Sequence, residues 1–168
     1  MLKGDFCFCS SPTLLTSIKD GYFVCVGGKC AGTFETLPPR YADFTLIDRS
    51  GCLIFPGLTA LRIHAPPVFL PGTAMHLELI DWLNNYAFSE EAKFADCAYA
   101  DRAYTIFADA IRKSATTRAC IFATRHRKAT ELLMDEMAQS SLATYVGKAN
   151  MDRESTKCSR KSPKNLLN

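Results

Sequence analysis

Short apolar runs alternate with turn residues in the first third of the chain. The runs are residues 5–9, 22–26 and 31–34. Gly27-Gly28 separates the last two runs, and a glycine pair between apolar runs is typical of a β-hairpin turn. Pro38-Pro39 ends this group, and residues 45–48 start another short strand. The pattern therefore predicts a small β-sheet domain over residues 1–54.

Helical spacing replaces this alternation in the second half of the chain. Between residues 98 and 114, apolar side chains recur at the intervals of one helix face, and Asp96 precedes them in the position of an N-cap. This face comprises Ala100, Ala103, Tyr104, Phe107 and Ile111. A second helix carries on one face Ala129, Leu132, Leu133 and Met137. We therefore predict two consecutive amphipathic helices.

Apolar runs that suit strands flank these two helices. Residues 53–63 come first, residues 118–124 form a continuous apolar run typical of a buried parallel strand, and residues 143–147 follow the second helix. Strand, helix, strand, helix, strand is a βαβ succession, so we expect a parallel sheet of at most three strands with right-handed connections. Ahead of the first helix, residues 77–85 are expected to form a short helix or turn that carries Trp82, the only tryptophan.

The formal charge of +3 over 168 residues is spread unevenly. Residues 153–168 hold five basic side chains and one acidic one and lack apolar periodicity, so we expect a basic, disordered tail. The remaining chain has 15 basic and 16 acidic side chains, without a basic stripe interleaved with aromatic residues, so we expect no nucleic-acid partner. No apolar run reaches the roughly 18 residues of a membrane span, and we expect a soluble protein without a membrane partner.

Eight cysteines are spread through strand-like and helix-like segments. The N-terminus is charged from Lys3 onward, and its apolar run is too short for a signal peptide. The sequence has no Cys-x-x-Cys pair, which argues against a zinc ribbon and against a cytidine deaminase-type site. Buried free thiols in a cytoplasmic protein are therefore the expected state of these cysteines.

Residues 55–66 connect the two halves of the chain and read Phe-Pro-Gly-Leu-Thr-Ala-Leu-Arg-Ile-His-Ala-Pro. Pro-Gly-Leu followed by a strand that ends in His-Ala-Pro resembles the first barrel strand of the amidohydrolases. In that family the strand reads Pro-Gly-Leu-x-Asp-x-His-x-His, and its two histidines lie on one side of the strand and bind one metal ion. In this chain Ala60 replaces the aspartate, Arg62 replaces the first histidine, and only His64 remains.

Further segments are similar to guanine deaminases, in particular the bacterial enzymes. They are residues 77–84, 88–92, 116–124, 126–127 and 145–152. The resemblance covers nearly the whole chain but only the N-terminal part of such an enzyme. It implies an α/β fold in which the β-domain precedes the first βα units of an incomplete (β/α)8 amidohydrolase barrel, residues 55–152. A closed barrel takes roughly 250 residues, so the chain is too short for one.

The resemblance implies a hydrolase of purine metabolism that converts guanine and water to xanthine and ammonia with one zinc ion. The family holds this metal with the histidine pair, two later histidines and an aspartate, while a glutamate moves protons. The later groups would lie beyond Asn168, and Arg62 has no lone pair to give a metal. His64 is therefore the one metal-ligand candidate, no residue is assigned a catalytic role, and we expect little zinc binding by this chain.

Four residues are assigned to the substrate side by the same resemblance: His64, Pro67, Trp82 and Leu83. Pro67 stands where the family has a glutamine that hydrogen-bonds guanine, and proline has no side-chain donor or acceptor. Trp82 belongs to a motif that lines the purine pocket in the family, and a core position is the alternative for a single tryptophan. His126 follows the second strand, at the end where barrel sites form, with a structural role as its alternative. His76 is expected to be solvent-exposed.

Two functions remain open from the sequence. The first is a guanine deaminase-like amidohydrolase that is truncated, inactive alone and cytoplasmic. The second is a non-catalytic partial-barrel protein that associates with itself or with a protein partner. An incomplete barrel and an incomplete β-domain would leave sheet edges and apolar surface in water, and a homodimer or an aggregate would follow.

Overall fold

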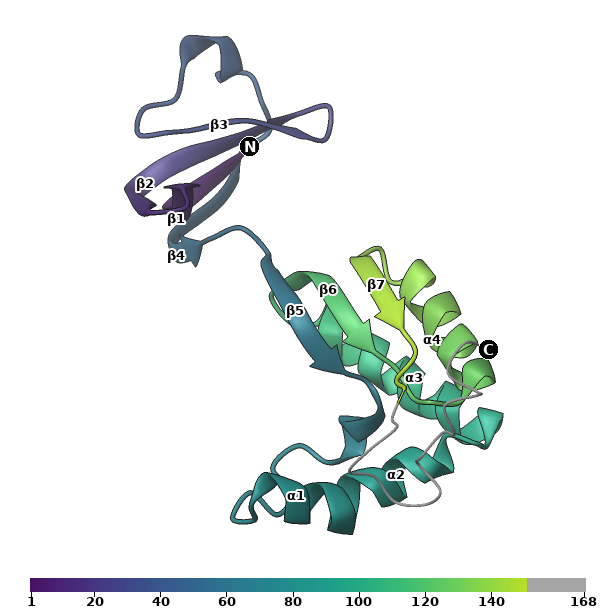
Figure 1. Cartoon of the computed structure of the whole chain (residues 1–168). Helices are drawn as coiled ribbons and strands as arrows, with labels where there is room; N and C mark the ends of the chain where they lie inside the picture. The colour runs from purple at the N-terminus through teal and green to yellow at the C-terminus, as the bar shows by residue number, and fades with distance from the viewer. Residues whose placement is uncertain (151–168) are drawn as a thin grey trace. The chain divides into compact units, whose positions relative to one another are not determined.

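The computed structural model describes residues 1–150, which fall into two compact units, Met1–Pro56 and a second unit that begins at Gly57 (Figure 1). The disordered tail predicted for residues 153–168 lies outside the described residues. Both helices and strands are present, as expected for a mixed α/β protein. None of the helices within residues 1–150 is long and apolar enough to cross a membrane.

The first unit is a four-stranded sheet with the order β3-β2-β1-β4. Its strands are β1 (Leu2–Ser11), β2 (Leu14–Val26), β3 (Lys29–Phe34) and β4 (Ile47–Ile54). Gly27 and Gly28 form the predicted turn between β2 and β3 with φ angles of +57° and +76°, a left-handed conformation that favours glycine. A short 3-10 helix, Pro39–Tyr41, lies in the crossover that brings β4 parallel to β1.

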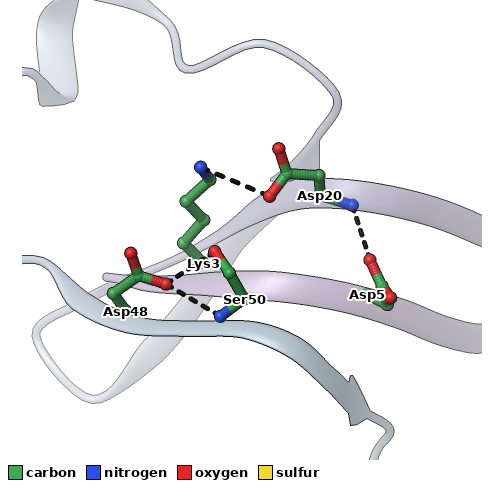
Figure 2. Close-up of polar contacts among 5 residues, drawn as sticks. All are labelled: Lys3, Asp5, Asp20, Asp48 and Ser50. Atoms are coloured by element: carbon green, nitrogen blue, oxygen red, sulfur yellow. Dashed lines mark hydrogen bonds and ion pairs between the residues drawn. The ribbon is translucent and has the colours of Figure 1, made fainter.

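Polar side chains occupy the points where the strand register of this sheet shifts (Figure 2). Between Gly4 and Phe6 of β1, the partner strand β2 contributes an extra residue. The N–H of Asp20 donates to Asp5 Oδ1 at 2.8 Å there, and Lys3 Nζ lies 3.3 Å from Asp20 Oδ1. In β4, Asp48 Oδ1 accepts from both the N–H and the hydroxyl of Ser50, and this hydroxyl is the main cause of the lowered Asp48 pKa.

The prediction of one strand over residues 53–63 is wrong. Leu53 and Ile54 belong to β4 and pair with β1, whereas β5 (Leu58–His64) starts the second unit. Phe55-Pro56-Gly57 separates the two strands, because proline offers no N–H to a sheet ladder. The short strand expected to start at residue 45 corresponds to β4, which extends through Gly51. The φ of +79° at Gly51 accommodates the register shift.

The second unit contains a parallel sheet with the order β5-β6-β7, formed with β6 (Thr116–Phe122) and β7 (Ala143–Gly147). Two helices, α3 (Cys97–Arg112) and α4 (Arg127–Gln139), connect these strands and pack against the sheet (Figure 1). The predicted βαβ succession is therefore confirmed.

Both predicted helix faces lie in the core of this unit. Buried residues of α3 include all five predicted positions, and those of α4 include Ala129, Leu133 and Met137. The fourth residue predicted for α4, Leu132, is partly buried against this core. Asp96 caps α3 as predicted, because its side chain accepts a hydrogen bond from the Ala98 N–H at 2.9 Å. The short helix or turn predicted over residues 77–85 begins later and extends further than expected: α1 (Leu79–Trp82) continues into a π-helical turn, Leu83–Ala87, and then into α2 (Phe88–Lys93).

Candidate functional site

The candidate site lies at the carboxyl end of β5, where the chain leaves the strand and enters a short 3-10 helix, Pro66–Phe69. Figure 1 shows α1 and α2 beyond the carboxyl ends of the parallel strands. A cavity of about 650 Å³ lies at this end of the unit. Its wall includes Arg62, His64, Pro67, Trp82, Leu83 and Glu91. The structure therefore brings all four residues assigned to the substrate side by sequence into one cavity.

His64 is the last residue of β5, and its ring stacks on that of Phe122 in β6. The ring centroids lie 5.0 Å apart with 17° between the planes, because the two residues are register partners in the parallel sheet. Partial burial lowers the pKa of His64, and the neighbouring Arg62 guanidinium lowers it further. The imidazole is consequently held in its neutral form at neutral pH.

Trp82 presents a fixed aromatic surface to the cavity. Its indole Nε1–H donates to the Thr73 carbonyl oxygen at 2.9 Å, which ties the ring to the loop before α1. The side chain is half-buried and lines the cavity beside Leu83. An aromatic face next to aliphatic groups suits a flat heterocyclic ligand.

Sequence reasoning missed Glu91, which is 8% exposed and lines the same cavity. Its Oε1 atom accepts from the backbone N–H of Arg125 at 3.1 Å and from the Thr124 hydroxyl at 3.3 Å. Burial raises the pKa of Glu91, and these hydrogen bonds oppose that change only in part. Its spacing of three residues from the buried Phe88 places it on the inner face of α2, and that spacing is the signal that could have identified it.

The two other histidines do not join this site. His126 occupies the N-cap position of α4 and lines a separate cavity of about 220 Å³ together with Phe94 and Lys128. His76 is exposed, as predicted. His126 follows β6 as predicted, but it stands at the start of α4 and lines this separate cavity, so it does not join His64 in one site.

The donor set around His64 does not fit a zinc ion. Within residues 1–150, no three His, Cys, Asp or Glu side chains lie close enough together to hold one metal. Arg62 is a permanent cation beside His64, and a catalytic zinc site needs about three protein ligands. No metal-dependent step can therefore be assigned to the described residues.

No known family model matches the chain. The chain is nevertheless similar to individual proteins, and the two described next are both guanine deaminases. A guanine deaminase from Dictyostelium discoideum is 34% identical over 111 residues, covering 66% of this chain and 25% of the relative. The Escherichia coli guanine deaminase is 30% identical over 142 residues, or 83% of this chain and 32% of the relative.

A solved structure extends the likeness to three dimensions. The crystal structure of guanine deaminase from C. acetobutylicum with bound guanine in the active site has a TM-score of 0.84 and 36% identity, covering 95% of this chain. This chain is a homologue of the N-terminal part of guanine deaminases. It spans about a quarter to a third of the curated relatives described here and 38% of that guanine deaminase structure. The guanine deaminase from Bradyrhizobium japonicum, with 23% identity and a TM-score of 0.82, agrees in fold.

Proposed function

We propose that this chain supplies the purine-facing wall of a guanine deaminase-type site. The observation that carries the proposal is the cavity of about 650 Å³ in which His64, Trp82 and Leu83 converge at the end of a parallel strand. Sites in βα barrels form at this end of the strands. In the same proposal, β5, β6 and β7 with α3 and α4 are the first βα units of an amidohydrolase barrel.

The ligand chemistry follows from the wall of the cavity. Trp82 offers a stacking surface, Leu83 and Ala123 offer apolar contact, and His64 offers one neutral ring with a donor and an acceptor. Pro67 contributes shape but no polar side-chain atom. These groups suit a planar, neutral base such as guanine, bound with modest affinity because few polar contacts fix its edge.

Equilibrium dialysis of radiolabelled guanine against the purified chain tests this assignment. We expect saturable binding that weakens several-fold in His64→Ala, because the ring on the cavity wall is lost. His76→Ala is the matched control, since His76 is an exposed histidine outside the cavity. Equal affinities for the two variants and the unmodified chain would contradict the assignment.

We further propose that the chain alone does not deaminate guanine. Ammonia release from guanine in the presence of zinc should not exceed that of buffer, and zinc retained after dialysis should stay well below one ion per chain. Arg62→His combined with Ala60→Asp should raise the zinc content only slightly, because the other ligands are still missing. Turnover that disappears in His64→Ala, or stoichiometric zinc in the unmodified chain, would overturn this part.

A second candidate function, self-association, has its own support. Large apolar side chains on the strands of the second unit are exposed: Leu58 is 53% exposed, Leu61 74%, Phe122 41% and Tyr145 78%. Large apolar side chains exposed to water favour association with another protein surface. Light scattering separates the outcomes, because a defined dimer would favour this function and a stable monomer in dilute solution would argue against it.

A further inference from the structure

Two cysteines lie directly opposite each other in the hairpin of the first unit. Cys25 on β2 and Cys30 on β3 are register partners in an antiparallel pair. Both side chains are exposed, so the prediction of buried thiols is wrong for these two cysteines. The two-residue turn Gly27-Gly28 separates the adjoining partners Val26 and Lys29. Within the strand pairings of residues 1–150, no other cysteine stands opposite a cysteine.

The hairpin geometry matches the needs of a disulfide. In a two-residue hairpin the pair next to the turn exchanges hydrogen bonds, so the next pair outward is not hydrogen-bonded. Opposed residues of that kind have Cα atoms about 4.5 Å apart and side chains on the same face, and a disulfide accepts Cα separations of about 4.4–6.8 Å. The register shift lies beyond this pair, between Cys25 and Val24, and leaves the pair itself opposed.

We propose that Cys25 and Cys30 form a reversible oxidation site that a low-molecular-weight disulfide such as glutathione disulfide converts to a hairpin disulfide. The thiolate of one cysteine attacks a sulfur of glutathione disulfide, forms a mixed disulfide and releases one glutathione thiolate. The second cysteine then attacks the protein sulfur of the mixed disulfide, forms the Cys25–Cys30 bond and releases the second glutathione. Two protein thiols are oxidised and one glutathione disulfide is reduced to two glutathiones.

The hairpin makes the second step intramolecular. Among the other exposed thiols, Cys52 in β4 has no cysteine as a register partner and Cys97 lies in helix α3, so both should stop at the mixed disulfide. Both hairpin thiols are accessible to glutathione and to reductants, and exposed disulfides are the ones that reduce readily. The modification does not depend on the purine-binding assignment, because neither cysteine lines the cavity around His64.

The sequence supplies a direct assay. Lys19, Lys29 and Arg40 are tryptic sites, and cleavage after Lys29 separates Cys25 from Cys30. The full chain is equilibrated in glutathione buffers, quenched with acid, alkylated, unfolded and digested with trypsin. We expect peptides 20–29 and 30–40 to be recovered as one disulfide-linked species, the mass of two hydrogen atoms below the sum of the two free peptides.

Matched variants define the outcome. In Cys25→Ser, the linked species should vanish and Cys30 should carry glutathione, whereas Cys9→Ser should leave the link unchanged. The linked fraction at a fixed glutathione ratio should also fall several-fold in urea, because the native hairpin is what opposes the two thiols. Separate glutathione adducts on both cysteines in the folded chain, links mainly to other cysteines, or an equal yield in urea would overturn the proposal.

Discussion

The hydrogen bonds of the buried Glu91 carboxylate predict how much stability the chain loses when this residue is replaced. Glu91→Ala removes the acceptor for the Thr124 hydroxyl, on a residue with 0% exposure, and for the half-buried Arg125 N–H. Glu91→Gln keeps an oxygen in the same place. A buried donor without an acceptor costs about 1–3 kcal/mol. The buried Thr124 hydroxyl should contribute this cost in full, and the half-buried Arg125 N–H only part of it. We therefore expect Glu91→Ala to be less stable than Glu91→Gln by about 2–3 kcal/mol.

The same pair of variants gives a pH dependence with a fixed sign. Burial raises the pKa of Glu91 above its ordinary value of 4.5, so the folded chain binds this proton more tightly than the unfolded chain. The resulting stabilisation is fully present below pH 4.5 and is lost as pH rises through the folded-state pKa. Glu91→Gln has no such proton. The stability of the unmodified chain should therefore decline relative to Glu91→Gln as pH rises from acid to neutral.

Urea unfolding followed by far-ultraviolet circular dichroism measures both effects. Midpoints and slopes are compared for the unmodified chain, Glu91→Ala and Glu91→Gln at several pH values. Equal unfolding free energies for the two variants at neutral pH would show that Glu91 does not hold the turn at Thr124. A stability difference between the unmodified chain and Glu91→Gln that is constant with pH would refute the stated cause of the pKa change.

Two further predictions concern the core and one helix end. Leu133→Ala, at a position with 0% exposure, should destabilise the chain by about 2–5 kcal/mol, whereas Met134→Ala, at 44% exposure, should change stability by about 0.5 kcal/mol or less, as measured by urea unfolding. Comparable losses would contradict the observed burial. Asp96→Ala should cost about 0.5–2 kcal/mol by loss of the cap to Ala98, and Asp96→Asn should restore most of it; thermal unfolding distinguishes them.

Elements with strong periodicity could be predicted from the sequence. The α3 face from Ala100 to Ile111 is buried as the spacing requires, and β7 has the bounds that its pattern predicts. The strand predicted over residues 118–124 spans Thr116–Phe122 instead. It begins earlier because polar β-branched residues pair with β5 without adding to the apolar run, and it ends two residues before the run does. The break between β4 and β5 at Phe55-Pro56-Gly57 was missed, since residues 53–63 read as one apolar segment although two sheets share it.

Only those residues of the candidate site that belong to a family motif could be predicted from the sequence. His64, Trp82 and Leu83 follow from the family resemblance and line one cavity. Glu91 was not predicted because an acidic residue in a helix is usually solvated. Its hydrogen-bond partners, Thr124 and Arg125, also lie more than 30 residues away in the chain. The sequence left two roles open for His126, because nearness to a strand end in sequence does not determine which cavity a residue lines.

The indole N–H of Trp82 tests the central claim most directly. Trp82 is the only tryptophan, so its Nε1–H gives a single indole signal in the nitrogen-15 correlation spectrum of the chain. This group donates to the Thr73 carbonyl oxygen, and Trp82 itself lines the cavity. Titration with guanine should shift the indole signal and the Leu83 amide along one saturable curve, and His64→Ala should weaken that response. An unchanged indole signal at guanine concentrations that move other residues, or shifts confined to residues 1–56, would contradict the assignment of this cavity to a purine.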